Sequence, residues 1–161
     1  KDIENDPAIL APVNGKRQFA VSGKLDPTNK KGVSLFSEWV IAAFKKSTSS
    51  KPEGLPLKKY MGVDAGDGLN YCHTADCEKE FKSVSDQFFY IANIVAKKIK
   101  AEDKNAGVCT YAYTERADTP SFGIEPNVHV QVVASAFQQV STTADLMKRK
   151  KRKTNTNKTE I

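Results

Sequence analysis

The stretch that decides the fold is LKKYMGVDAGDGLNYCHTADC, Leu57–Cys77. Its first residues, LKKYMGV, are typical of a strand, and a glycine-rich loop follows directly. A helical pattern precedes this strand in the chain and another follows it. Such alternation is typical of parallel strands joined by right-handed crossovers, with helices packed on the sheet. The stretch therefore predicts an α/β protein.

The surrounding segments extend this pattern to the order β-α-β-α-β-β. Phe36, Trp39, Val40 and Ala43 recur at helical spacing and predict a core-facing helix. A second apolar stripe runs from Phe88 to Ile99, in a helix that begins near Ser83 or Asp86. The segments expected are strands over 18–23, 57–63, 108–114 and 128–135, with helices over 34–46 and from about 83 to 99.

Charge divides the chain into a neutral part and a basic tail. Residues 148–161 hold seven lysines and arginines and one glutamate, which accounts for the whole net charge of +6. We expect residues 1–147 to form one domain and 148–161 to be a solvated, disordered tail. A basic tail alone is weak support for a nucleic-acid partner. No apolar run approaches the about 20 residues that cross a membrane, so we expect no membrane partner.

Several segments, in order, resemble a bacterial family catalogued as a domain of unknown function and regarded as similar to α-glucuronidase-type glycoside hydrolase barrels. The resembling segments are DPAILAPVNGKRQ, GVDAGDGLNYCHTADC, SDQFFYIANIVAKKI, TYAYTERADTP and IEPNVHVQV, which together span about Asp6–Val133. The resemblance implies a (β/α) TIM barrel, a polysaccharide context and a periplasmic or secreted location. A full barrel takes about 250 residues. We therefore expect a partial barrel, completed by further barrel segments or by a second chain.

Two acidic residues are the candidates for catalysis. Glycoside hydrolysis uses two carboxyl groups, one on each side of the scissile bond. Asp67 follows the second predicted strand and Glu115 follows the third. Parallel strands would bring both loops to one edge of the sheet. In the alternative interpretation, Asp67 only shapes a turn between two glycines and Glu115 pairs with Arg116 on the surface.

Three further residues are expected to contact the sugar. Tyr113 alternates with Tyr111 on one face of its strand, where its ring could stack on a sugar or pack in the core. Asp64 and Asn70 flank the glycine-rich loop; Asp64 could align a sugar hydroxyl, although turn formation is its commoner role. Both residues, with Asp67, also offer oxygen ligands, but the distal glutamate of a calcium loop is missing.

The cysteines leave their chemistry open. Cys72, His73, Asp76 and Cys77 offer metal ligands, but no second paired set stands elsewhere in the chain, so we expect no metal. The spacing of Cys72 and Cys77 permits a disulfide if the protein is exported and also permits free thiols, which are expected in the cytosol. The resembled family often has three cysteines here, and Thr74 stands at the middle position. No fingerprint of an organic cofactor is present, and we expect none.

The sequence thus predicts a carbohydrate-active protein that resembles a glycoside hydrolase, with a poly- or oligosaccharide as its partner. Whether this chain alone is an enzyme stays open. The alternative is a non-catalytic carbohydrate-binding or assembly module.

Overall fold

The computed structural model describes residues 6–17, 23–49, 59–66 and 70–133, which form a mixed α/β structure. The predicted strand over residues 18–23, except Gly23, and the basic tail lie outside the described residues. The elements are η1 (Pro7–Ile9), α1 (Lys30–Ser49), β1 (Tyr60–Gly62), α2 (Ala75–Glu80), α3 (Val84–Glu102), β2 (Gly107–Ala112), η2 (Thr114–Arg116) and β3 (Val128–Val132).

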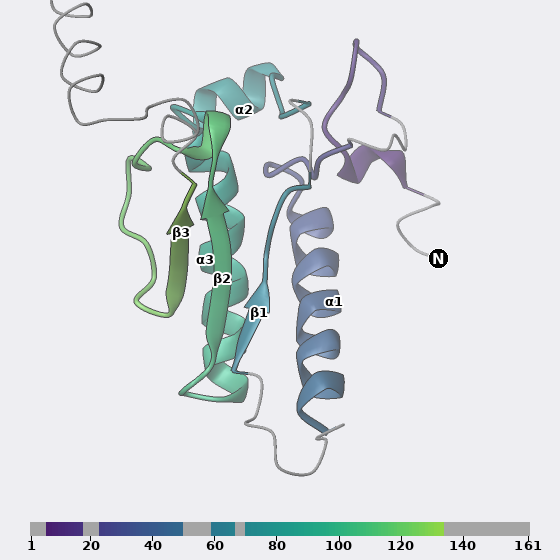
Figure 1. Cartoon of the computed structure of the whole chain (residues 1–161). Helices are drawn as coiled ribbons and strands as arrows, with labels where there is room; N and C mark the ends of the chain where they lie inside the picture. Colours follow the sequence, from purple (N-terminus) through teal and green to yellow (C-terminus); the bar gives the residue numbers. More distant parts are fainter. Residues whose placement is uncertain (1–5, 18–22, 50–58, 67–69, 134–161) are drawn as a thin grey trace, which may run out of the picture.

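The three strands of the described residues form one small sheet in the order β1-β2-β3. Both pairings are parallel, with Tyr60 opposite Gly107 and Val108 opposite Val128. The predicted parallel arrangement is therefore confirmed. All three strands point the same way, so that they end along one edge, the upper one in Figure 1. We call this end of the sheet, with segments 63–66 and 113–116, the carboxyl edge.

Both long helices cover the same face of the sheet. Figure 1 shows α3 behind β2 and β3, with α1 beside β1. The core between helices and sheet is built from Val40, Phe44, Val63, Val95, Ala96, Ile99, Ala106 and Val108. Burial of these apolar side chains is the main force that holds the helices on the sheet. No helix among the described residues is long and apolar enough to cross a membrane.

The opposite face of the sheet carries exposed side chains, and we call it the open face. Cys109, Tyr111 and His129 are exposed on it, whereas Val108, Thr110 and Ala112 point to the core side and are buried. Tyr60 and Tyr113 extend the open face at its two ends. Parallel sheets are normally covered on both faces. Among the described residues, helices cover only one face of this sheet.

Two boundaries of the first helix differ from the prediction. The helix begins at Lys30 rather than Ser34, because the side-chain oxygen of Asn29 accepts a hydrogen bond from the Gly32 N–H at 2.9 Å and so caps the helix end. It continues to Ser49 instead of Lys46, and the hydroxyl of Ser47 donates to the Phe44 carbonyl in the last turns.

The expectation that Trp39 faces the core is wrong. The tryptophan is 64% exposed, because the buried stripe of α1 runs through Val33, Ser37, Val40 and Phe44. Trp39 lies beside this stripe and stacks on Phe36, with ring centroids 6.2 Å apart. Its spacing of three residues from Phe36 puts Trp39 on the side of the helix next to the buried stripe, but not in the stripe itself.

The short helix α2 was not predicted. The Thr74 hydroxyl caps it by accepting a hydrogen bond from the Cys77 N–H at 3.3 Å. Ser83 caps α3 in the same way and confirms one of the two predicted start sites. With β1 at 60–62, β2 at 107–112 and β3 at 128–132, the second, third and fourth predicted strands are confirmed within a few residues.

Candidate functional site at the carboxyl edge

Asp64 joins the ends of two strands. It follows β1 after the buried Val63, and its Oδ1 accepts hydrogen bonds from the Thr110 hydroxyl at 3.1 Å and the Tyr111 N–H at 3.2 Å. The side chain is nevertheless 31% exposed. All the donors that the described residues supply to this carboxylate go to Oδ1. Asp64 thus has one oxygen engaged with β2 and an accessible surface at the carboxyl edge.

Arg116 lies beneath the same edge, with its side chain only 7% exposed. Its Nη1 is 3.5 Å from Asp64 Oδ1, and its guanidinium lies over the Phe88 ring at 4.9 Å from the centroid. Nε has no hydrogen-bond partner among the described residues. The alternative interpretation, a surface pair of Arg116 with Glu115, is not found among the described residues, because stacking on Phe88 holds the guanidinium inside, where Asp64 is its carboxylate partner.

Thr114 turns the chain sharply after β2. Its φ is 51°, in the left-handed region that β-branched residues rarely adopt. This conformation directs η2 back across the edge, so that the carbonyl of Glu115 accepts a hydrogen bond from the Ser85 hydroxyl of α3 at 3.4 Å. Backbone strain of this kind costs about 1–3 kcal/mol and tends to occur at functional sites.

Tyr71 connects the two acidic loops electrostatically. The residue is 5% exposed, and burial raises the pKa of its hydroxyl. The charge of Arg116 opposes this shift in pKa, whereas the charges of Glu115 and Asp64 add to it. The ion pair between Asp64 and Arg116, with 3.5 Å between Oδ1 and Nη1, shows that the loops after β1 and β2 meet at the same edge.

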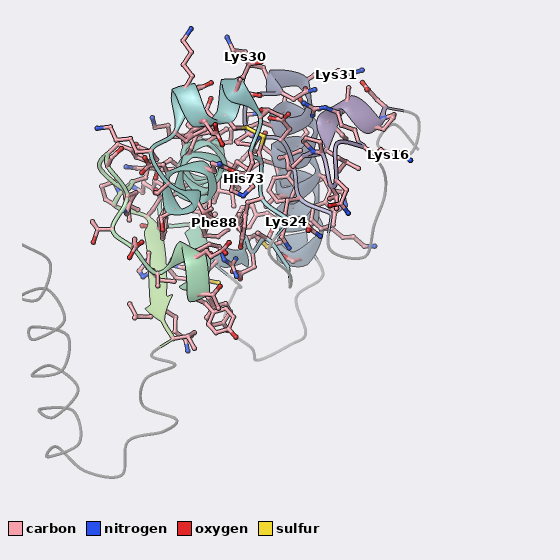
Figure 2. All side chains as sticks on the ribbon, turned by 90° about the horizontal axis from the view of Figure 1, so that it is seen from above. Lys16, Lys24, Lys30, Lys31, His73 and Phe88 are labelled. Atoms are coloured by element: carbon pink, nitrogen blue, oxygen red, sulfur yellow. A yellow bond between two sulfur atoms is a disulfide. The ribbon has the colours of Figure 1, made fainter. Side chains whose placement is uncertain are left out.

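Lys24 comes to this edge from the N-terminal segment. The residue is 5% exposed, its Nζ donates to the Gly66 carbonyl at 3.0 Å, and it lies 5.7 Å from the centroid of the Tyr71 ring. Figure 2, seen from above the carboxyl edge, shows Lys24 and Phe88 inside the molecule and Lys30 and Lys31 at its rim. Sequence reasoning missed Lys24, Tyr71 and Arg116. For Tyr71 the available signal was an aromatic residue within the glycine-rich loop.

The remaining predicted site residues have mixed outcomes. Asp67 lies outside the described residues, so its role stays a prediction. Asn70, on the far side of that gap, is half-buried. Glu115 is exposed, and Tyr113 and Tyr111 are 39% and 44% exposed on the open face. The predicted alternation along β2 is therefore confirmed, and the tyrosines are not core residues.

Cys72 and Cys77 form a disulfide. A disulfide was one of the two states that the sequence left open. Asp26 Oδ1 lies 3.5 Å from Cys77 Sγ, and its carboxylate pairs with Arg17 at 2.6 Å. These two sulfurs and Asp26 are close enough to surround an ion. Metal binding by cysteine needs the thiolate, however, and the disulfide occupies both sulfurs.

The disulfide segment is also fixed to α3. The Gln87 side chain donates to the Cys72 carbonyl at 2.8 Å and accepts from the Cys72 N–H at 3.3 Å. The amide of Gln87 thus satisfies both the N–H and the C=O of Cys72, the two backbone groups that a neighbouring strand would otherwise pair with. It sets the position of Tyr71, the preceding residue, and thus shapes the carboxyl edge.

Comparison with protein families identifies a relationship that covers almost the whole chain. Residues 3–159 match the family model described as a domain of unknown function, DUF4838. The chain belongs to the DUF4838 family. Comparison with curated proteins gave no match, and neither did comparison with solved structures. Because the description of the DUF4838 family states no activity, any function of this chain has to be argued from the carboxyl edge itself.

Proposed function

We propose that this DUF4838 chain is a carbohydrate-active protein whose site lies at the carboxyl edge and extends onto the open face. The observation that carries the proposal is the meeting of the loops after β1 and β2 at the end of a parallel sheet, where Asp64 Oδ1 lies 3.5 Å from Arg116 Nη1 and next to the exposed Glu115 segment. Ligands of parallel α/β proteins bind where strands end in loops. Carboxylates and a guanidinium are suitable partners for the hydroxyl groups of a sugar.

Exposed tyrosines supply the second part of such a site. Tyr111 and Tyr113 present their rings on the open face next to the carboxyl edge. An aromatic ring combines an apolar face, which can cover the C–H side of a sugar, with a hydroxyl that can hydrogen-bond it. A row of exposed tyrosines beside carboxylates therefore favours a saccharide over an apolar ligand here.

Hydrolysis would use Asp67 and Glu115 as the pair of carboxyl groups. Such pairs are separated by about 5–5.5 Å in retaining enzymes and by about 6.5–9.5 Å in inverting ones. Asp64, ion-paired with Arg116, would orient a sugar hydroxyl together with Tyr113 and Asn70. The strained turn at Thr114 would hold Glu115 over the edge.

The uncovered sheet supports the further proposal of a partial TIM-like barrel. Its strands are parallel, its helices lie on one face, and its other face is exposed. In a barrel, that other face would line the interior, and Tyr111 and Tyr113, near the carboxyl end of β2, would lie at its mouth beside the carboxyl edge. The remaining units would come from more of the same polypeptide or from a second chain. The disulfide fits an oxidising compartment, as the periplasmic or secreted expectation requires.

The test is hydrolysis of oligosaccharides that carry glucuronic acid, measured for the wild type and for Asp67→Asn and Glu115→Gln. Each substitution should abolish turnover, by about 100-fold or more, and leave saccharide affinity within a factor of three. The control is Glu78→Gln on the exposed side of α2, which should hydrolyse normally. Unchanged turnover in both site variants would contradict the assignment.

A non-catalytic binding or assembly module is the second candidate. The observation that favours it is the structural engagement of Asp64, whose Oδ1 holds β2 in place. This candidate predicts that no turnover is measured in any variant and that saccharide binding survives Asp67→Asn and Glu115→Gln. Binding would then depend on Tyr111 and Tyr113, and substitution of both by alanine would remove it.

A further inference from the structure

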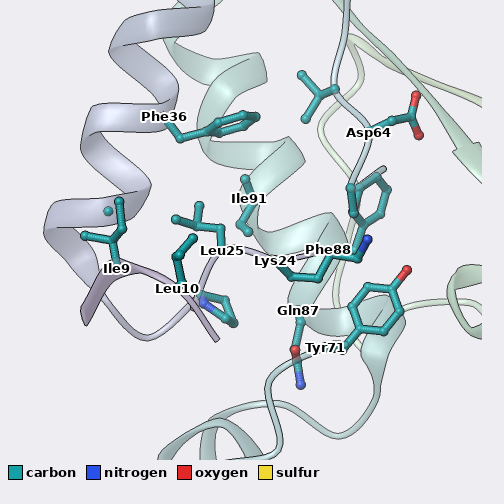
Figure 3. Close-up of a pocket in the computed structure, with 15 residues that line it drawn as sticks. Ile9, Leu10, Lys24, Leu25, Phe36, Asp64, Tyr71, Gln87, Phe88 and Ile91 are labelled. Atoms are coloured by element: carbon teal, nitrogen blue, oxygen red, sulfur yellow. The ribbon is translucent and has the colours of Figure 1, made fainter. Parts of the chain in front are cut away.

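A cavity of about 250 Å³ lies behind the end of β1, between the N-terminal segment, α1 and α3. Its wall is mainly apolar: Ile9, Leu10, Leu25, Phe36, Phe88 and Ile91 contribute to it. Figure 3 shows Ile9, Leu10, Leu25 and Phe36 on one side and Phe88 and Tyr71 on the other. Every carbon of a sugar ring carries a polar group or a ring oxygen, so this wall does not suit a sugar.

Lys24 and the hydroxyl of Tyr71 lie near each other at one corner of the cavity (Figure 3). The Lys24 chain ends there, close to the hydroxyl side of Tyr71 and to the Phe88 ring (Figure 3). The amide of Gln87 also lines the cavity, but both of its ends are engaged with the Cys72 backbone. The nearby Asp64 is paired with Arg116. The cationic group at this corner is the ammonium of Lys24, whose Nζ also donates to the Gly66 carbonyl at 3.0 Å.

We propose that this cavity binds a small aromatic carboxylic acid, with its rings among the apolar side chains and its carboxylate at Lys24 and the Tyr71 hydroxyl. The volume exceeds the about 150 Å³ of a cavity that holds benzene, so it has room for two fused rings. Phe36, Phe88 and Tyr71 supply aromatic partners for those rings. An ammonium and a carboxylate in a largely dry site form a strong, charge-assisted hydrogen bond.

This ligand site is separate from the proposed saccharide site. The cavity wall is formed largely by the helix side of the sheet and by the N-terminal segment, whereas Tyr111 and Tyr113 are exposed on the open face. The two regions share the residues at the end of β1, Val63, Asp64 and Ala65, together with Lys24 and Tyr71. Failure of one proposal still leaves the other standing.

The experiment is isothermal titration calorimetry of the full chain with 2-naphthoate and with its neutral analogue, 2-naphthalenemethanol. The wild type should bind the acid about tenfold more tightly than the alcohol. Lys24→Met should weaken acid binding about tenfold and leave alcohol binding unchanged, which also shows that the cavity is intact. Lys104→Met, at an exposed turn, is the charge-matched control and should behave as the wild type.

A second pair of variants tests the cavity itself. Ile91→Phe fills it from α3 and should weaken binding of both probes at least tenfold. Ile94→Phe makes the same change on the same helix at a residue that does not line the cavity, and it should bind as the wild type. If Ile91→Phe fails to fold, Leu25→Phe fills the cavity from the opposite wall. No binding to the wild type, or unchanged acid affinity in Lys24→Met, would overturn the proposal.

Discussion

Asp86 shows how one buried carboxylate can hold a loop in place. It is 2% exposed; its Oδ1 accepts from the Ser121 N–H at 2.6 Å, and its Oδ2 accepts from the Ser121 hydroxyl at 2.8 Å and the Lys82 N–H at 3.0 Å. Burial acts to raise the pKa of Asp86, but these hydrogen bonds and the Lys82 charge outweigh it, so the pKa is lowered. The loop before β3 is thereby tied to the start of α3.

This lowered pKa predicts a stability that depends on pH. Because the pKa is lower in the folded state, Asp86 contributes fully above its unfolded-state pKa of about 3.9, and the contribution is lost as pH falls through the folded-state pKa. Asp86→Asn should lower the free energy of unfolding by about 1–3 kcal/mol at pH 7 and by clearly less at pH 2.5. Urea unfolding at both pH values measures this. Asp118→Asn, at an exposed site, is the control, and an equal loss at both pH values would contradict the argument.

Gly107 on β2 and Gly62 on β1 differ in the space around them, so one serves as a control for the other. A Cβ at Gly107 would collide with the Asn127 carbonyl oxygen and touch the Tyr60 ring, whereas a Cβ at Gly62 would meet nothing within 4 Å. Gly107→Ala should therefore cost about 2 kcal/mol or more of unfolding free energy, and Gly62→Ala should stay within about 0.5 kcal/mol of the wild type. Thermal or urea unfolding compares them. If both substitutions change the unfolding free energy equally, the lack of room for a Cβ at Gly107 is not the reason for the glycine there.

At the level of single residues, the sequence predicts which side chains of a strand are exposed better than it predicts which groups a charged side chain contacts. The alternation of Cys109, Tyr111 and Tyr113 on the open face follows from the two-residue period of a strand. The burial of Arg116 and Lys24 could not be predicted, because it depends on Phe88 and Tyr71, which are distant in the sequence. Long charged side chains extend beneath apolar rings when the tertiary structure offers them.

At the scale of elements, the disulfide stabilises the segment before α2 through chain entropy. Cys72 and Cys77 are five residues apart, and closing so short a loop is worth about 2 kcal/mol in the chain-entropy model. The double variant Cys72→Ser, Cys77→Ser should lower the free energy of unfolding by about this amount or more, since both residues are buried.

Urea unfolding with and without dithiothreitol checks this prediction. The reductant should destabilise the wild type and leave the double variant unchanged. Cys109→Ser provides the control, because that cysteine is free and exposed and its replacement should have no measurable effect. A wild type insensitive to the reductant, once both thiols are shown to be free, would contradict a stabilising disulfide.

Elements with a long apolar period could be predicted, and elements formed by caps could not. The stripe of Phe88, Ala92, Val95 and Ile99 predicted α3 because each of these side chains is buried on one face. The helix α2 has few residues and one buried side chain, Cys77, so no period marks it. Its local signals were the cap at Thr74 and the acidic first turn with Asp76 and Glu78, and such polar residues also fit a turn.

At the scale of the whole molecule, the order of strands and helices was enough to predict a parallel sheet with a common carboxyl edge. The direction of the strands follows from the crossover helices. The sequence could not show that the described helices cover one face only. An amphipathic stripe indicates that a helix packs against the sheet, but it does not indicate which face of the sheet it covers. The open face with its exposed tyrosines is therefore a finding of the structure.

The measurement that tests the central claim most directly is NMR chemical-shift mapping of the full chain, titrated with glucuronic-acid-bearing xylo-oligosaccharides. If the carboxyl edge and the open face form a saccharide site, added ligand should shift a common set of amide signals until the site is saturated. These signals belong to Asp64, Tyr111, Tyr113 and Glu115. Signals on the outer faces of α1 and α3 should stay in place. Shifts confined to the helices, with none at the ends of β1 and β2, would contradict the claim.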